Sequence, residues 1–353
     1  MKKNRIEEAP PKRKRKIKII FQGLFLLFLI VGTIWVIRQN NNMTYHTNHG
    51  FIFGTQYNIT YKYDKDLQSD IEAELQKVDN SLSPFNKQSI ITKVNNNEEI
   101  VVDKMFKEVF LLAMNISKET DGAFDITVAP LVNVWGFGFK NDQTPNEQSV
   151  DSLRQFIGYQ KVKLSSSGHV TKEDPRIMLD CSAIAKGYGC DAVARLFNRL
   201  GINNYMVEIG GEVVTRGESA KQHPWHIGVT KPTDDSIHVN NGLQTILNVT
   251  NYSMATSGNY RNFYYKDGVK YAHTIDPRTG YPVQHSLLSA TVLAKDCATA
   301  DAYATSFMVL GVDKAKEILR RHPELMAYFI YAKPNGDNAV WFSDALREKI
   351  IDQ

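Results

Sequence analysis

The chain has 353 residues, of which 42% are hydrophobic and 23% are charged, so it is long enough to bury one large core or two modest ones. Its formal net charge is +4, but residues 1–18 alone hold nine Lys and Arg against two Glu. Removing these from the totals of 42 basic and 38 acidic residues leaves 33 and 36, a net charge of −3. The rest of the chain has no broad excess of positive charge, which argues against nucleic acid as a partner.

The first predicted element is the apolar segment 19–37, IIFQGLFLLFLIVGTIWVI, in which Gln22 is the one strongly polar side chain. As a helix it would be about 28 Å long, close to the hydrocarbon thickness of a bilayer. The apolar part of a cleaved signal peptide is shorter, and Trp35 and Arg38 stand where a cleavage site would need small residues. We therefore predict one uncleaved N-terminal transmembrane helix.

The charges around this segment predict its orientation. Residues 1–18 form a basic tail, which stays in the cytoplasm by the positive-inside rule. Residues 38–50 are expected to be a polar linker, and residues 51–353 a domain on the periplasmic or extracellular side. The predicted location is the inner, or cytoplasmic, membrane.

The first half of the outer domain alternates strand-like and helix-like segments. Residues 53–63 alternate as a strand does, and apolar residues at 67, 71, 75, 78 and 82 have helical spacing. Residues 104–122 predict a second helix that ends at Gly122. The apolar run 123–138 contains Pro130, so it is not one continuous central strand.

The second half is rich in strand signals. Residues 204–217 read as a hairpin that turns at Gly210-Gly211, and residues 263–275 as a hairpin that turns at Asp267-Gly268. Three more strands are expected, one in residues 287–294 and two in residues 325–344. Helices interspersed among hairpins predict an α+β fold with a mixed, largely antiparallel sheet and packed helices.

The three cysteines have no assigned pairing in the sequence. Cys181 and Cys190 lie on one predicted helix about 13 Å apart, too far for a disulfide. Cys297 could form a disulfide only with Cys181 or with Cys190, and the sequence does not decide whether it does. The preferred interpretation is that all three are small buried hydrophobic residues.

The helix predicted after Asp180 offers a candidate anion site. Ser182 is the expected N-cap, Lys186 lies in the first turns, and Gly187 follows it. A cation, a glycine and free amides at a helix start suit a phosphate group. The alternative is a surface lysine above a glycine that is needed only for close packing, and both interpretations remain open.

A second helix, residues 296–311, places Asp301 and Thr305 four residues apart on one face among alanines. A carboxylate and a hydroxyl suit a hard cation such as Mg²⁺, and burying Asp301 without a partner would be costly. His273, in AHTIDPRTG, is either a satisfied histidine at a strand end or a general base that Asp276 could orient. Together, a phosphate site, a Mg²⁺ pair and a histidine are what phosphoryl transfer from a pyrophosphate needs.

Six segments in order resemble the ApbE family of FAD:protein FMN transferases, across about residues 51–345. They are TDGAFDITVAPLVNVWGFG, LDCSAIAKGYGCD, VEIGGE, ATSGNYRNFY, HTIDPRTGYPV and ADAYATSFMVLG. The resemblance implies an enzyme that transfers FMN from FAD to a threonine hydroxyl of a target protein and releases AMP. It also implies a requirement for Mg²⁺ and acceptors among membrane-linked redox flavoproteins.

The resemblance also implies roles for individual residues. Asp301 and Thr305 match side-chain Mg²⁺ ligands, Ala183 matches a carbonyl ligand, and His273 matches the histidine taken as the base. The implied FAD contacts are Phe53, Phe85, Ala123, Phe124, Asp125, Asp180, Lys186 and Leu287. Two further functions remain open: a FAD pyrophosphatase, in which water replaces the threonine, and a flavin carrier that does no chemistry.

Overall fold

The computed structural model describes residues 12–41, 43–138, 145–232, 242–259, 263–266, 269–335 and 337–351. It divides into two compact units. The small unit comprises Met1–His46 with Lys62–Asp66, and the large unit comprises Thr47–Tyr61 with Leu67–Gln353. Each is described by itself.

The small unit contains helix α1, Lys12–Asn41. Within it, Lys16–Ile34 has 19 residues with a mean hydropathy of 2.3, none of them buried. Among the described residues this is the one helix whose length and composition suit a membrane span, and it overlaps the predicted anchor 19–37. Residues 1–11 of the predicted basic tail lie outside the described residues, and the rest of that tail begins α1.

The predicted linker, residues 38–50, is wrong in its extent. α1 continues to Asn41, and strand β1 already begins at Thr44 and ends at Ile52. β1 is an edge strand whose neighbour in the sheet is β2, Thr55–Tyr63. An edge strand tolerates polar side chains because much of it faces solvent, so its composition looks like that of a linker.

The large unit is built on an eight-stranded sheet in the order β1-β2-β5-β6-β9-β12-β13-β14. The neighbouring pairs from β2 to β14 are antiparallel, which confirms the predicted largely antiparallel sheet. The further strands of this sheet are β5 Tyr205–Ile209, β6 Glu212–Arg216, β9 Ser253–Gly258, β12 Leu287–Ala294, β13 Met326–Ala332 and β14 Asn338–Phe342.

Three small sheets accompany the large one. They are β3-β4 (Val162–Leu164 and Val170–Lys172), β10-β11 (Phe263–Lys266 and Val269–Ala272), and β15-β8-β7 (Ile350–Ile351, Leu243–Asn248 and His226–Thr230). β10 and β11 form the second predicted hairpin, although its turn at 267–268 lies outside the described residues.

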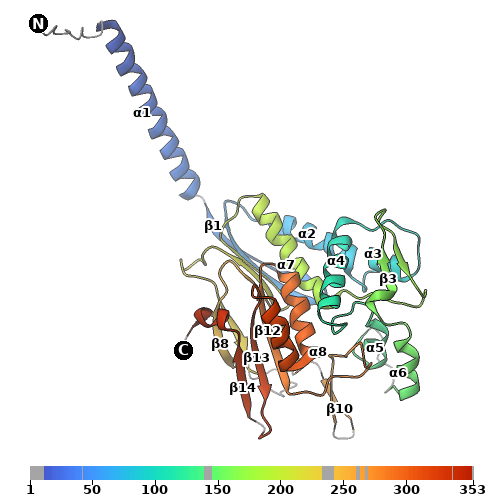
Figure 1. Ribbon diagram of the computed structural model, residues 1–353. Helices are drawn as coiled ribbons and strands as arrows, with labels where there is room; N and C mark the ends of the chain where they lie inside the picture. Colours follow the sequence, from blue (N-terminus) through green and yellow to red (C-terminus); the bar gives the residue numbers. More distant parts are fainter. Residues whose placement is uncertain are drawn as a thin grey trace, which may run out of the picture. The chain divides into compact units, whose positions relative to one another are not determined.

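Helices α7 and α8 lie side by side, and α8 packs on β9 and β12 (Figure 1). The helices of the large unit are α2 Gln68–Leu82, α3 Ile90–Asn95, α4 Lys104–Glu119, α5 Ala129–Val134, α6 Glu147–Arg154, α7 Ser182–Arg199 and α8 Cys297–Arg321, with 3₁₀ turns η1 Tyr159–Lys161 and η2 Asp344–Lys349. Pro130 lies in the first turn of α5, where a missing N–H costs nothing.

The sheet has apolar cores on both faces, which makes the unit three layers thick. On one face, Val292 and Phe329 belong to a core shared with α4, α7 and α8. On the other face, Leu293 and Ile330 pack with the small sheet β15-β8-β7. Alternating strand residues thus enter opposite cores, as the period of a strand requires. The predicted α+β class is confirmed.

Candidate functional site

A cavity of about 540 Å³ lies in the large unit, a volume typical of small-molecule sites. It brings together every predicted site residue except Leu287. Those that line it are Phe53, Phe85, Ala123, Phe124, Asp125, Asp180, Ala183, Lys186, His273, Asp301 and Thr305. Leu287 is instead 1% exposed in the hydrophobic core, so the structure does not place it in the cavity wall.

One wall of the cavity is aromatic. Phe53 lies in the turn between β1 and β2, where Phe53 and Gly54 have φ of 51° and 75°, as a type I′ hairpin turn requires. Positive φ is unfavourable for a bulky residue, so the turn holds Phe53 in a strained conformation. Phe85, after α2, is 68% exposed although it lines the cavity. Both side chains line the cavity, and an aromatic wall suits a planar ligand.

The loop between α4 and α5 supplies a second wall through Ala123, Phe124 and Asp125. Asp125 accepts hydrogen bonds from the Thr127 N–H (2.8 Å), the Thr127 hydroxyl (2.6 Å) and the Tyr159 N–H (2.7 Å). Burial raises the pKa of Asp125 even though these hydrogen bonds favour its charged form. The carboxylate thus fixes the loop that carries Phe124.

The start of α7 differs from the prediction. Ser182 is the first helical residue and not the N-cap; Cys181 holds the cap position and makes no side-chain cap bond. The Asp180 carboxylate accepts from the Ser182 N–H at 2.8 Å and from the Ser182 hydroxyl at 2.5 Å. The Asp180 carboxylate therefore already accepts from donors at the start of this helix. Desolvation raises the pKa of Asp180.

Gly187 is needed for helix packing. A Cβ atom there would lie 2.4 Å from the carbonyl oxygen of Cys297, at the start of α8. The Gly187 N–H donates to Asp301 Oδ2 at 3.1 Å, and in a regular helix that N–H donates to the Ala183 carbonyl. The Asp301 carboxylate thus competes with the Ala183 carbonyl oxygen for the Gly187 N–H. Gly187 is thus closely packed, and its N–H donates to a carboxylate of the protein.

Lys186 is not a surface lysine. Its Nζ lies 3.1 Å from Glu212 Oε1 and 3.8 Å from Asp301 Oδ2, and the two carboxylate side chains are only 4% and 3% exposed. Burial favours the neutral amine, but Asp301 and Glu212 together outweigh it and raise the pKa of Lys186. Burial also raises the pKa of Glu212, with Lys186 opposing and Asp301 adding to the shift.

The oxygens beside Lys186 fit a hard cation. Asp301 offers a carboxylate and Thr305 a hydroxyl, which lies 3.2 Å from the hydroxyl of Ser257 on β9. No group of three or more His, Cys, Asp and Glu gathers as a metal site among the described residues. A cation here would therefore draw on hydroxyl and carbonyl oxygens and on the ligand itself, an arrangement that Mg²⁺ accepts.

His273 lines the same cavity directly after β11, and its ring meets Phe137 edge-on with centroids 6.4 Å apart. Asp276, the residue that could orient this ring, pairs with Arg278. Both Asp276 oxygens accept from the Arg278 guanidinium, at 2.9 and 2.7 Å. This bidentate pair closes the turn after His273, so Asp276 holds the loop that positions the imidazole.

The comparisons with known proteins agree with this geometry. Residues 53–329 match the sequence profile of the ApbE family. The chain belongs to the ApbE family. Two relatives called FAD:protein FMN transferase are 34% identical (Escherichia coli K12; 84% of this chain, 85% of the relative) and 36% identical (Haemophilus influenzae; 81% and 86%). The flavin transferase ApbE of Vibrio cholerae superposes with a TM-score of 0.79 at 33% identity, covering 87% and 99% of the two chains.

Two residues that line this cavity were not predicted from the sequence. Glu212 and Ser257 lie in VEIGGE and ATSGNYRNFY, two of the segments that resemble the family, but neither was singled out there. A glutamate after a glycine turn reads as an exposed hairpin residue. Only the packing of β6 and β9 against α7 and α8 brings Glu212 to Lys186 and Ser257 to Thr305.

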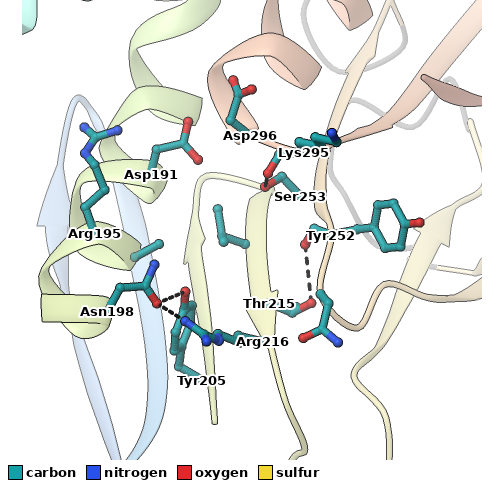
Figure 2. Close-up of a pocket in the computed structure, with 13 residues that line it drawn as sticks. Asp191, Arg195, Asn198, Tyr205, Thr215, Arg216, Tyr252, Ser253, Lys295 and Asp296 are labelled. Carbon is teal, nitrogen blue, oxygen red and sulfur yellow. Dashed lines mark hydrogen bonds between the residues drawn. The ribbon is translucent and has the colours of Figure 1, made fainter. Parts of the chain in front are cut away.

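A second hollow, the polar hollow, has about 630 Å³ and contains no predicted site residue (Figure 2). Its lining includes Asp191, Arg195, Asn198, Tyr205, Arg216, Lys295 and Asp296. Asp191 accepts from the N–H groups of Cys297 and Ala298 at 2.8 and 2.9 Å, and Asn198 accepts from Arg216 and Tyr205. The Asn198 carboxamide and the Asp191 carboxylate therefore have protein partners.

The cysteines behave as the preferred interpretation predicts. Cys181, Cys190 and Cys297 are all buried and free. Burial raises the pKa of each thiol, which keeps them protonated and unreactive in this state.

Proposed function

We propose that this chain transfers FMN from FAD to a threonine hydroxyl of an acceptor protein and releases AMP. The observation that carries the proposal is one cavity that joins aromatic walls, a buried Lys–carboxylate cluster and His273. Each part suits a different portion of the reaction: a flavin ring, a pyrophosphate and a hydroxyl nucleophile. The relatives called FAD:protein FMN transferase cover most of the chain and support the same reaction.

The residue roles follow from the cavity walls. Phe53, Phe85 and Phe124 contact the flavin, and Ala123, Asp125 and Asp180 hold the surrounding loops and bind polar atoms of FAD. Lys186 lies beside the pyrophosphate as a cation in a low-dielectric site, where a charge interaction is stronger than in water. Leu287 supports the wall from the core, without direct contact.

The transfer is a displacement at phosphorus. The acceptor hydroxyl forms a P–O bond to the FMN phosphate, while the bond from that phosphorus to the bridging oxygen breaks and AMP leaves with the electron pair. His273 takes the proton of the attacking hydroxyl, which is a poor nucleophile at neutral pH. Arg278 and Asp276 keep the His273 loop in place during this step.

Asp301, Thr305 and the Ala183 carbonyl are the residues that would hold Mg²⁺. When bound, the ion would reduce the negative charge of the pyrophosphate oxygens. The oxygen-rich donor set and the burial of Asp301, which is 2% exposed, support this assignment.

The product distribution tests the proposal against its two alternatives. The full chain is incubated with FAD, Mg²⁺ and a purified candidate acceptor, then AMP, free FMN and gel-stable flavin fluorescence are measured. We expect equal amounts of AMP and of acceptor-bound FMN, lost when the acceptor threonine is changed to valine. Free FMN at the level of AMP would establish a pyrophosphatase, and FAD binding without AMP a carrier.

We further propose that α1 anchors the enzyme in the inner membrane and that the large unit faces the periplasmic or extracellular side, near membrane-linked redox flavoproteins. The basic cluster before the apolar segment supports this orientation. Protease added to spheroplasts is expected to digest residues 51–353. Protection of that region in intact spheroplasts would contradict the orientation.

A further inference from the structure

Glu212 is the least satisfied charged group in the cavity. Its side chain is 4% exposed, and its Oε2 has no hydrogen-bond partner among the described residues. A buried carboxylate oxygen without a donor is costly, so its presence in the wall calls for a reason. The backbone around it is fixed: Glu212 begins β6 after the Gly210-Gly211 turn, and its carbonyl accepts from the Cys190 thiol at 3.3 Å.

The position of the Lys186 ammonium gives that reason. Lys186 lies between two carboxylates but 0.7 Å closer to Glu212 (3.1 Å) than to Asp301 (3.8 Å). Asp301 Oδ2 has another donor, the Gly187 N–H, whereas Glu212 Oε2 has none among the described residues. The Lys186 ammonium therefore stays beside Glu212, the carboxylate with fewer hydrogen-bond donors. Its contact with Asp301 is the longer one, at 3.8 Å.

We propose that Glu212 is a positioning residue that holds Lys186 off Asp301 and so keeps Asp301 available to a divalent cation. The inference rests on the proposed cation site at Asp301 and Thr305. Without the Glu212 charge, Lys186 would close onto Asp301 as a direct ion pair, and an incoming cation would have to displace it.

Cation binding without FAD tests this arrangement. Mn²⁺ is the probe, because carboxylate and hydroxyl oxygens accept it as they accept Mg²⁺ and its free form is measured by EPR. The full chain is titrated in detergent, with every variant at the same pH and ionic strength. Wild type, Glu212→Gln, Lys186→Met and the double variant are compared, with Glu208→Gln on neighbouring β5 as the matched control, since Glu208 does not line the cavity.

We expect Glu212→Gln to weaken Mn²⁺ binding at least about tenfold, because Lys186 then pairs with Asp301. Lys186→Met should tighten binding, because it removes the competing ammonium. In the Lys186→Met background, Glu212→Gln should cost less than about threefold, since no ammonium is left to misplace. Glu208→Gln should leave the affinity unchanged.

Four results would overturn the inference. An unchanged affinity in Glu212→Gln would show that Lys186 position does not matter. An equal loss in both backgrounds would make Glu212 a direct ligand of the cation. If Glu212→Gln does not fold, weaker or unchanged Mn²⁺ binding by folded Lys186→Met would contradict the proposal. Failure of the wild type to bind Mn²⁺ would remove the proposed cation site as well, so the two failures are distinguishable.

Discussion

The cavity and the polar hollow, both in the large unit, have similar volumes, and the difference between them shows what makes a site. In the polar hollow, the Asp191 carboxylate accepts hydrogen bonds from two backbone N–H groups at the start of α8. In the cavity, Glu212 Oε2 has no partner among the described residues, and Lys186 is shared between two carboxylates. The two hollows do not differ much in volume. They differ in whether their buried charged groups have hydrogen-bond partners within the protein.

The same pair of helices supplies both hollows, so the difference is local. α7 contributes Lys186 to the cavity and Asp191 to the polar hollow, and α8 contributes Asp301 and its own first N–H groups. At the start of α8, a carboxylate and the helix amides complement each other, which stabilises the helix pair. Further along α8, Asp301 lies beside the Lys186 ammonium and lines the cavity with its aromatic wall. This arrangement suits a charged ligand.

The largest expected effect distinguishes the two carboxylates on this helix pair. Asp301→Ala should reduce FMN transfer at least about a thousandfold, because a bound metal contributes several kcal/mol to phosphoryl transfer. Asp191→Asn, the matched control in the polar hollow, should retain transfer. Single-turnover assays at limiting Mg²⁺ measure both. Normal turnover by Asp301→Ala would remove the cation site from the account.

His273 has the next largest expected effect. His273→Ala should slow transfer at least about a hundredfold, because general-base help contributes that much to attack by a hydroxyl. FAD affinity should change little, since the flavin and pyrophosphate contacts are elsewhere in the cavity. Flavin fluorescence gives the affinity beside the single-turnover rate. Weakened binding with an unchanged chemical step would make His273 a ligand contact and not a base.

Two glycines of α7 should differ in stability. Gly187→Ala should lower the free energy of unfolding by about 1–3 kcal/mol, because its Cβ would meet the Cys297 backbone at 2.4 Å. Gly189→Ala would meet the Phe53 ring instead, at 2.6 Å, and a side chain moves more easily than backbone. Its effect should appear as weaker FAD binding. Denaturant unfolding and FAD titration check both, and equal stability losses would contradict the distinction.

The smallest effect concerns pH and the polar hollow. Burial raises the pKa of Asp191 to about 7, although the N–H groups of Cys297 and Ala298 oppose the shift. Between about pH 4 and 7 the unfolded chain has lost this proton while the folded chain retains it, so the Asp191 contribution to stability falls as pH rises. The stability of wild type relative to Asp191→Asn should therefore decline over this range, by on the order of 1 kcal/mol. Thermal unfolding at several pH values measures it, and a relative stability that rises with pH would reverse the sign.

Patterns with a short period were readable in the sequence. The apolar residues Leu67, Ile71, Leu75, Val78 and Leu82 are all buried on one face at α2, as their spacing predicts. The Gly210-Gly211 turn has φ of 61° and 102°, which glycine adopts without strain. Local periodicity and turn chemistry act over a few residues, so a single chain reveals them.

What escaped prediction depends on contacts between distant segments. Glu212 acquires its role only through Lys186 on another element. Asp276 pairs with Arg278, a contact that was not predicted from the sequence. β1 looks like a linker because an edge strand needs few apolar residues. Ser182 has the chemistry of a cap, but Asp180 engages its hydroxyl and N–H.

A structure of the full chain with FAD and Mn²⁺ tests most directly that the cavity, and not the polar hollow, is the flavin site. The account predicts the isoalloxazine against Phe53 and Phe124, the pyrophosphate beside Lys186, and an anomalous Mn²⁺ peak beside Asp301 and Thr305. FAD in the polar hollow near Arg195 and Arg216, or a Mn²⁺ peak remote from Asp301, would contradict it.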